Sequence, residues 1–561
     1  MNPLPPRVRK QTVLALLAAS LMALPMLAHS DEREDLEKLR ATVLGLIDTL
    51  VKSGVIQRGQ ADALMREAQR KADAQLAAAP APEVGVDGKK IVRVPYVPEA
   101  VRSQMRDQIT AEVLAQTRAG GVGSAGAASV TESGSRLQIE GDLRLRGEAI
   151  RPAAANTPAQ AYSAASPDLT RAADLYGNPG FDTREQQNRS RVRARLGFNV
   201  AVAEGVSTGL ALSTGGVTGP TSTNQTMASG AGQTPGYFNK YSLVVDKAFI
   251  RYEPISGLSL SGGRIRNPFV ATDLLWADDL NFDGFAAAWK APAGTLIDSF
   301  VTGGWFPLSY TSGPGRVSRR SLMALQAGFN WQLGTKNNRI KLAAALYDFS
   351  GIEGIKETTT DKTTVPDYAV RSEYGAGYRQ RGNTLFRVNS NVASDTATTW
   401  GLASGFRELD LTAAIDIAQF DPLHIILTGD IVRNLAFNQG DLQRRSTTRV
   451  ADGSGTGYLA QLQVGAPLVR SKGAWNVSLG YRRLGSDAVL DAFTNSDFGL
   501  GGTNHKGFTL GGQYGLAKNT WLAARWLSSE AIDSMVPAVA GSSTKTKFSI
   551  DTLQFELNAR Y

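Results

Sequence analysis

The sequence predicts an all-β transmembrane barrel of about 16 antiparallel strands, preceded by a small N-terminal α-helical region. Three observations support this fold class. Apolar and polar residues alternate over long segments from residue 136 to the C-terminus, which is the period of a β-strand. Short and long connections alternate between these segments. The 561 residues are 42% hydrophobic, but the part beyond residue 30 is poor in the long apolar runs that a helical membrane protein needs.

The first thirty residues have the pattern of a secretory signal peptide. Basic residues precede the apolar run 13–27, and small residues follow it. A membrane anchor is the alternative, but the run is short and Pro25 interrupts it. We therefore predict export, with residues 1–30 removed. Their removal lowers the formal net charge from +9 to +6, which is too mild to indicate a nucleic-acid partner.

Residues 31–78 are predicted to form a helical head. Apolar residues recur there at spacings of three and four, the pattern of a short coiled coil. These candidate oligomerisation residues are Leu36, Leu39, Val43, Leu46 and Leu50. A monomeric helical hairpin is the alternative, so both a monomer and a homo-oligomer such as a trimer remain open. Residues 79–135 are predicted to be a linker with a short helix.

The barrel is predicted to occupy residues 136–561. One of the clearest strands runs from Val192 to Val202, where apolar residues alternate with Arg193 and Arg195. The predicted strands lie near 136–150, 188–203, 206–214, 241–253, 257–266, 283–292, 295–306, 320–333, 338–349, 407–420, 422–434, 456–468, 473–484, 506–516, 519–528 and 547–561. An even strand number, with short turns at one end and long loops at the other, is typical of a barrel in the outer membrane.

The position of the apolar face distinguishes a membrane barrel from a soluble one. Sixteen strands enclose a lumen too wide to be filled by alternating apolar side chains. An apolar face toward outer-membrane lipid leaves the polar face lining water, and closure satisfies every backbone group. Aromatic residues near strand ends are expected to form interfacial girdles. They are Tyr252, Trp289, Trp305, Phe306, Tyr347, Trp475, Tyr481, Trp521 and Trp526.

Three segments resemble known sequences. The last strand, 553–561, ends on an aromatic residue and is similar to the C-terminal signal recognised by the barrel assembly machinery, which implies that role for Phe555, Leu557 and Tyr561. Segments 50–64 and 267–284 resemble the "putative porin" family of Gram-negative bacteria. The resemblance spans nearly the whole mature chain. It implies a pore in the outer membrane, with the helical head in the periplasm.

Basic residues on one face of neighbouring predicted strands are the sharpest polar feature. The candidate pore-lining residues are Arg144, Arg146, Arg189, Arg191, Arg193, Arg195, Lys247, Arg251 and Arg264. On a lumen wall they would concentrate anions. The alternative is a solvated face without selectivity, because Glu140, Asp142 and Asp246 lie among them.

Two long loops are candidates for narrowing the pore. Loop 267–282 and the position after it hold the candidate constriction residues Asp273, Asp278, Asp279 and Asp283. The resemblance implies that this loop folds inward and faces the arginines, while loop 350–406 could instead plug the lumen. Segment 279–284 begins like a calcium-binding loop, but Lys290 stands where a glutamate is needed. We therefore expect no metal and no cofactor.

These features predict a pore that passes small hydrophilic solutes by diffusion, with anion preference as a hypothesis. A structural protein or adhesin that links envelope layers through its head is the second reading. An outer-membrane hydrolase is the third. Export leaves only His424 and His505, neither with a serine and carboxylate at recognisable spacing. The chain has no Cys, which excludes cysteine catalysis. We therefore predict that the protein is not an enzyme and has no catalytic residues.

Overall fold

Alternating sequence segments form long strands in the part of the chain that the structure describes. The computed structural model describes residues 136–158, 183–229, 236–291, 296–311, 318–334, 338–357, 372–375, 377, 379–389, 399–445, 453–533 and 547–561. The chain divides into two compact units, Met1–Gly121 and Val122–Tyr561. The expected signal peptide, helical head and linker lie outside the described residues and stay predictions.

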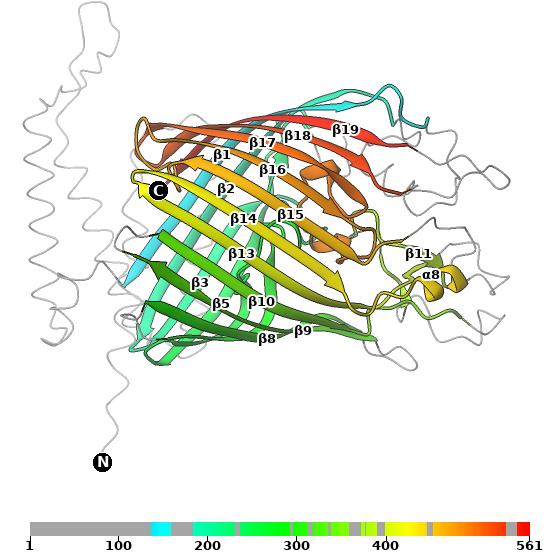
Figure 1. Cartoon of the computed structure of the whole chain (residues 1–561), viewed down its shortest axis with the longest axis horizontal. Coiled ribbons are helices and arrows are strands. Elements are labelled where there is room, and N and C mark those ends of the chain that lie inside the picture. The colour runs from blue at the N-terminus through cyan, green and yellow to red at the C-terminus, as the bar shows by residue number, and fades with distance from the viewer. Residues whose placement is uncertain are drawn as a thin grey trace, which may run out of the picture. The chain divides into compact units, whose positions relative to one another are not determined.

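Sixteen long strands run antiparallel around one barrel (Figure 1). They are β1 (Leu137–Pro152), β2 (Gln187–Ala203), β3 (Val206–Thr214), β5 (Leu243–Ile255), β6 (Leu258–Arg266), β7 (Asn281–Lys290), β8 (Ile297–Thr311), β9 (Ser318–Leu333), β10 (Asn338–Ser350), β13 (Phe406–Phe420), β14 (Leu423–Asn434), β15 (Thr456–Gly465), β16 (Trp475–Leu484), β17 (His505–Ala517), β18 (Thr520–Ala531) and β19 (Ser549–Arg560). Shorter elements are β4 (Gln225–Thr226), β11 (Leu385–Arg387), β12 (Trp400–Leu402), α8 (Gln439–Arg445), η3 (Asp491–Phe493) and η4 (Phe498–Leu500). No described helix has the length and hydrophobicity of a membrane span.

The barrel closes because the first strand pairs with the last. The β1–β19 register runs from Asp142 opposite Arg560 to Pro152 opposite Ile550. The backbones of Gly141 and Tyr561 exchange two hydrogen bonds of 3.0 Å at the end of this pairing. Closure leaves no free edge strand in the ring. The predicted antiparallel barrel is confirmed, and each predicted strand corresponds to one of the sixteen.

Short turns join the strands at one end of the barrel. Gly205 and Gly257 have φ angles of 68° and 86° in two such turns, a backbone conformation that glycine adopts without steric cost. A Cβ atom at Gly257 would lie 2.3 Å from the Lys290 carbonyl oxygen. At the opposite end, loops 267–280 and 485–504 are long. The alternation of short and long connections is therefore as predicted.

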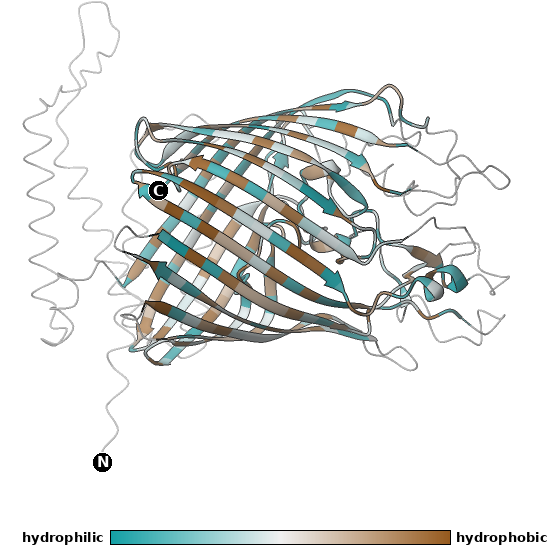
Figure 2. Ribbon diagram, viewed as in Figure 1, coloured by the Kyte–Doolittle hydropathy of each residue, from teal (hydrophilic) through white to brown (hydrophobic). Residues whose placement is uncertain are grey.

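The outer face of the barrel is apolar (Figure 2). On β19, Leu553, Phe555 and Leu557 are exposed, whereas Gln554 and Glu556 between them are buried. This alternation places apolar side chains toward lipid and polar ones toward the lumen. The outer membrane is therefore the environment that the surface fits.

Three of the residues expected in the aromatic girdles lie on the lumenal face instead. Trp289 and Trp305 are exposed on the outside, but Phe306 and Tyr347 are almost completely buried. Phe306 directly follows Trp305, and consecutive strand residues point to opposite faces. The prediction of a girdle position was wrong for Phe306 and Tyr347, which belong to a core inside the barrel. It was also wrong for Trp521, which directly precedes the outward-facing Leu522 and stands opposite the buried Asn558.

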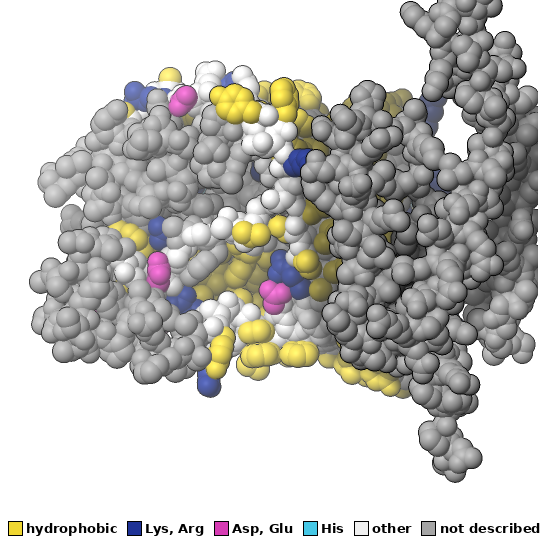
Figure 3. Space-filling model, turned by 180° about the vertical axis from the view of Figure 1, so that it is seen from behind, with side chains coloured by type: hydrophobic (Ala, Val, Ile, Leu, Met, Phe, Trp, Pro, Cys, Tyr) yellow, Lys and Arg dark blue, Asp and Glu magenta, His cyan; other side chains and the backbone are white. Residues whose placement is uncertain are grey.

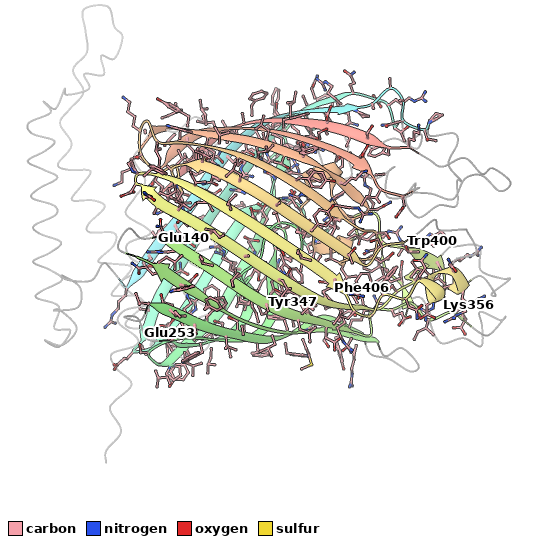
Figure 4. All side chains as sticks on the ribbon, in the orientation of Figure 1. Glu140, Glu253, Tyr347, Lys356, Trp400 and Phe406 are labelled. Atoms are coloured by element: carbon pink, nitrogen blue, oxygen red, sulfur yellow. The ribbon has the colours of Figure 1, made fainter. Side chains whose placement is uncertain are left out.

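That core fills part of the lumen. Phe269 and Trp276 of loop 267–280 lie edge-on to Tyr347 of β10, with ring centroids 5.3 and 5.1 Å apart. Residues 488–490 and 492 of loop 485–504 are buried in the same cluster, together with Phe406. Figure 4 labels Tyr347 and Phe406 on neighbouring strands of this wall. Two loops therefore fold into the lumen and pack against the side formed by β6–β10 and β13–β16.

Candidate pore constriction

The arginines of β1 and β2 lie next to one another on the inner face of the barrel. In the pairing register Arg144 stands opposite Arg193, and Arg146 stands opposite Arg191. Like charges directly opposite each other destabilise a sheet. Nearby carboxylates are therefore needed to hold this arrangement.

Three carboxylates of the wall each contact at least two arginines, and Glu556 also lies 3.2 Å from a third, Arg525 of β18. The contacts are Glu556 with Arg146 (2.7 Å) and Arg144 (3.4 Å), Asp142 with Arg195 (2.6 Å) and Arg193 (2.8 Å), and Glu148 with Arg189 (3.0 Å) and Arg191 (3.7 Å). Glu556 comes from β19, so the network spans four strands. These carboxylates therefore neutralise much of the positive charge of the arginines on this wall.

Asp279 brings the end of loop 267–280 onto this wall. Its Oδ1 lies 3.3 Å from Nη1 of both Arg193 and Arg195. Its Oδ2 accepts a hydrogen bond of 3.2 Å from the Thr223 hydroxyl. Burial alone would raise the pKa of Asp279, but Arg193 and Arg195 outweigh it and hold the pKa below its ordinary value. Asp279 therefore stays ionised.

Asp497 joins the second inward loop to the same network. Its carboxylate lies 2.9 Å from Arg146 and 3.0 Å from Arg525 of β18. Burial favours the neutral acid, but Arg146, Arg525 and Arg191 together hold the pKa of Asp497 far below its ordinary value. Two loops thus each place one charged aspartate on the basic wall.

Loop 267–280 crosses the lumen, since it is tied to several walls. Val270 exchanges two hydrogen bonds with the Gln326 amide of β9, at 2.7 and 2.6 Å. Thr272 donates to Asp430 of β14, and Asp273 lies 2.5 Å from Arg482 of β16. Asp279 adds contacts to Arg193 and Arg195 of β2. The loop is therefore anchored to four strands, β2, β9, β14 and β16, and it crosses the lumen instead of following its wall.

An acidic patch lies about halfway around the barrel from the arginines. It consists of Glu408 and Asp410 on β13 and Asp430 on β14, all almost completely buried. Among the described residues, no basic side chain forms an ion pair with any of the three. The ionisable groups are therefore distributed unevenly, with ion-paired arginines on one wall and buried carboxyl groups opposite.

The sequence comparison with known families decides the class of this barrel. Residues 40–561 match the model of a family described as "Putative porin". The chain belongs to this porin family. The match covers the barrel and most of the preceding segment. A search of curated proteins finds no match.

Solved structures similar to this porin are outer-membrane proteins. OprB of Pseudomonas putida is 9% identical, with a TM-score of 0.41 over 78% of this chain and 96% of that chain. The channel DcaP of Acinetobacter baumannii is 12% identical, with a TM-score of 0.36 over 76% and 97%. OmpT of Vibrio cholerae, in vitro folded and in a trimer form, is 10% identical, with a TM-score of 0.37 over 76% and 99%.

The structure separates the predicted pore-lining residues of the porin into two groups. The six arginines of β1 and β2 form the network above. Lys247 lies 3.5 Å from Glu140, and the Arg251 guanidinium lies 5.4 Å from the ring centroid of Phe249 on the inner side. Arg264 does not belong with them. It directly precedes Ile265, which is buried in the lumenal core, so Arg264 points outward.

The structure also separates the predicted constriction residues into those of loop 267–280 and one on the outer surface. Asp279 and Asp273 bind the walls as described, and Asp278 between them is exposed. Asp283 lies within β7, opposite Arg264 and 3.0 Å from its guanidinium. Because Asp283 directly follows the lumenal Phe282, it faces outward. Arg264 and Asp283 are therefore excluded from the constriction of the porin, because strand alternation places both on the outer surface.

Two further sets of predicted residues can be located. Phe555 and Leu557 are exposed on the outer face of β19, and Tyr561 follows that strand. Their recognition by assembly machinery stays a prediction. The five coiled-coil residues Leu36, Leu39, Val43, Leu46 and Leu50 lie outside the described residues.

The histidines do not form a hydrolytic site in the described part of the porin. His424 Nδ1 lies 2.6 Å from Asp416, and its Nε2 lies 3.7 Å from Asp421, so its contacts are carboxylates. His505 is buried against the Phe498 ring, with centroids 4.9 Å apart. His424 is the second residue of β14 and His505 is the first residue of β17, and these strands start at opposite ends of the barrel.

Sequence reasoning missed several members of the site. Glu556 and Arg525 sit on the polar face of alternating strands, and that alternation was the available signal. Asp497 and Arg482 could not be placed in the same way, because their roles depend on how loops 485–504 and 267–280 fold. No local pattern marks an inward loop.

Proposed function

We propose that this outer-membrane channel passes small hydrophilic solutes by diffusion along the β1–β2 side of its lumen, with a modest preference for anions. The observation that carries this proposal is an excess of positive charge where two loops approach one wall. The arginines are Arg144, Arg146, Arg189, Arg191, Arg193, Arg195 and Arg525, and the carboxylates are Asp142, Glu148, Asp279, Asp497 and Glu556.

The route follows from what fills the rest of the lumen. The side of the lumen formed by β6–β10 and β13–β16 is occupied by the apolar core of the two loops, which excludes water and ions. The arginine side keeps accessible charge. The side chains of Arg189, Arg195 and Arg525 are 28%, 33% and 31% exposed, so a passing anion can approach these three guanidinium groups.

The preference is expected to be modest because most of the charge is paired. Arg146 is almost inaccessible between Glu556 and Asp497. Within this network of ion pairs, the seven arginines and five carboxylates leave a net charge of two positive charges beside the solute path. Such an excess biases ions without excluding neutral solutes.

Planar-bilayer recording of the purified protein across a salt gradient tests the proposal. We expect stepwise conductance and a reversal potential of anionic sign. Addition of uncharged polyols of increasing size should reveal which solutes enter the pore, because those that enter lower its conductance. Absence of any conductance step would overturn the channel, and a reversal potential of cationic sign would overturn the anion preference alone.

The predicted periplasmic head is tested separately. Deletion of residues 31–78 followed by mass measurement in detergent distinguishes an oligomerising head from a tether between envelope layers. A smaller number of copies per particle supports oligomerisation through the head. An unchanged number of copies refutes that role and leaves the tethering reading.

A further inference from the structure

A row of basic side chains follows the outer face of β13–β17 at the long-loop end of the barrel. The first or last residue of four of these strands is buried inside the barrel, and strand alternation turns the residue next to it outward. The buried residues are Phe406, Asn434, Leu484 and His505. The outward residues beside them are all basic: Arg407, Arg433, Arg483 and Lys506. We call these four residues the basic row.

The outward positions at the other end of these strands are apolar or aromatic. Leu423 of β14, Trp475 of β16 and Tyr514 of β17 are exposed there. The long loops of an outer-membrane barrel are extracellular and its short turns are periplasmic. The basic row therefore lies on the side of the outer leaflet.

Two members of the basic row have no carboxylate partner. Arg407 and Lys506 each lie next to a carboxylate of the neighbouring strand, at 3.1 and 3.0 Å. Across the described part of the chain, the side chains of Arg433 and Arg483 form neither an ion pair nor a hydrogen bond. Arg483 also stands directly opposite Lys506 in the β16–β17 register, and like charges at such positions destabilise a sheet. The protein therefore leaves two positive charges of the row without compensation.

An outward arginine on the far side of the barrel is paired. Arg264 of β6 lies 3.0 Å from Asp283 of β7. Figure 3, which views the molecule from behind, shows a basic and an acidic side chain side by side on that face. The strands of the basic row face the viewer in Figure 1. Arg433 and Arg483 therefore differ from Arg264 in having no acidic neighbour, which indicates that their counter-charge comes from outside the chain.

Aromatic side chains locate the basic row at the level of the lipid headgroups. Tyr458, Tyr481 and Phe508 lie on the outer faces of β15, β16 and β17, with neighbouring ring centroids 6.2 and 4.8 Å apart. Tyr458 stands opposite Arg483 in the register. Phe508 is the next outward residue after Lys506. Aromatic girdles of barrels lie where hydrocarbon meets headgroups, so the basic row just beyond the rings lies among the headgroups.

We propose that Arg433, Arg483 and Lys506 bind the phosphate groups of an outer-leaflet glycolipid. Charge complementarity supports this ligand, because a guanidinium group binds two phosphate oxygens through parallel hydrogen bonds and an ammonium group binds phosphate as a point charge. Arg433 and Arg483 lie two strands apart in the sheet, which is roughly 10 Å. A headgroup with two phosphates can therefore contact both arginines.

The wall below the basic row fits the acyl chains of the same lipid. Ile431, Leu479 and Leu510 are exposed on β14, β16 and β17, nearer the middle of the barrel than the aromatic rings or the arginines. Basic, aromatic and apolar side chains thus follow one another in the order in which a lipid presents its headgroup and its chains. This binding site is independent of conduction through the lumen.

Native mass spectrometry of the full-length protein in detergent tests the site. The probes are lipid A with two phosphates and its monophosphoryl form. We expect the parent protein to bind the diphosphoryl form more tightly. Arg433→Gln with Arg483→Gln should weaken this binding about 25-fold, at about fivefold for each basic residue near a charged lipid headgroup, and should reduce the preference for the second phosphate.

Arg470→Gln with Lys472→Gln is the matched control. Both residues are exposed in the turn between β15 and β16, so the control removes the same charge from the opposite end of the barrel and should leave the affinity unchanged. Equal weakening by both variants would show attraction by net charge alone and would overturn the proposal. Equal affinity of the parent protein for the two lipids would also overturn it, and this comparison requires no substitution.

Discussion

Asp279 and Asp283 are four residues apart and occupy opposite sides of the wall. Asp279 precedes β7 and reaches Arg193 and Arg195 inside the lumen. Asp283 lies within β7, where alternation turns it outward to Arg264. The same side-chain chemistry therefore has different consequences for ions in the pore.

Replacement of Asp279 by Asn should make the channel more selective for anions. Loss of one negative charge changes the energy of an ion about 8 Å away in water by roughly 0.5 kcal/mol, or about twofold in permeability ratio. Reversal potentials across a salt gradient measure this change. Asp283→Asn removes the same charge from the outer face and should leave the ratio unchanged. Equal shifts in both variants would place Asp279 outside the conducting path.

Asp497 anchors loop 485–504 through a buried pair of contacts. Replacement by Asn leaves Arg146 without one of its carboxylates and should destabilise the docked loop by about 3 kcal/mol. The pKa of Asp497 is depressed in the folded protein, so its contribution is present above the ordinary Asp value near 3.9 and is lost as pH falls through the folded value.

The pH dependence makes the Asp497→Asn prediction specific. The difference in stability from the parent protein should be complete at pH 7 and still present at pH 5, and it should shrink only in stronger acid. Urea midpoints of the detergent-solubilised protein measure it. Asp278→Asn, at an exposed loop position, provides the control. If the difference in stability disappears between pH 7 and pH 5, the arginine contacts do not lower the pKa of Asp497 in the folded protein.

Loop 267–280 depends on Gln326 at its start. Gln326→Leu removes two hydrogen bonds to Val270 and leaves a backbone N–H and carbonyl without their partners, at about 1–3 kcal/mol each. We expect larger open-channel current and more current noise in single-channel recordings, because the loop is released from one wall. Gln461→Leu, on the inner face of β15, is the matched control. Identical traces for both variants would mean that the remaining anchors suffice.

The strands were predictable, and the loops were not. Alternation over Val192–Val202 or Leu553–Leu557 depends only on neighbouring residues, so the sequence alone indicates both strand and face. The same alternation shows that Phe306, which follows the outward-facing Trp305, points into the lumen and is not part of the girdle. The inward path of loop 267–280 depends on Gln326, Asp430 and Arg482, which are distant in sequence. Such contacts leave no local pattern.

The whole ring depends on its last strand. Deletion of residues 549–561 removes β19 and leaves β1 and β18 as unpaired edges in lipid, where each unsatisfied backbone group costs several kcal/mol. We expect complete loss of the compact species that migrates differently from boiled protein in gel electrophoresis. Tyr561→Phe keeps the backbone and the aromatic ring and should retain this species. A compact, protease-resistant truncated chain would show that another strand pair can close the barrel.

Because β1 pairs with β19, the barrel can close only after β19 has been synthesised. The strand translated first and the strand translated last are neighbours in space, so their contact spans almost the whole barrel sequence and is slow to form. Until β19 has been made, any sheet built from this chain has two open edges that could pair with other chains. Delivery to the membrane must therefore keep the unclosed polypeptide apart from its copies.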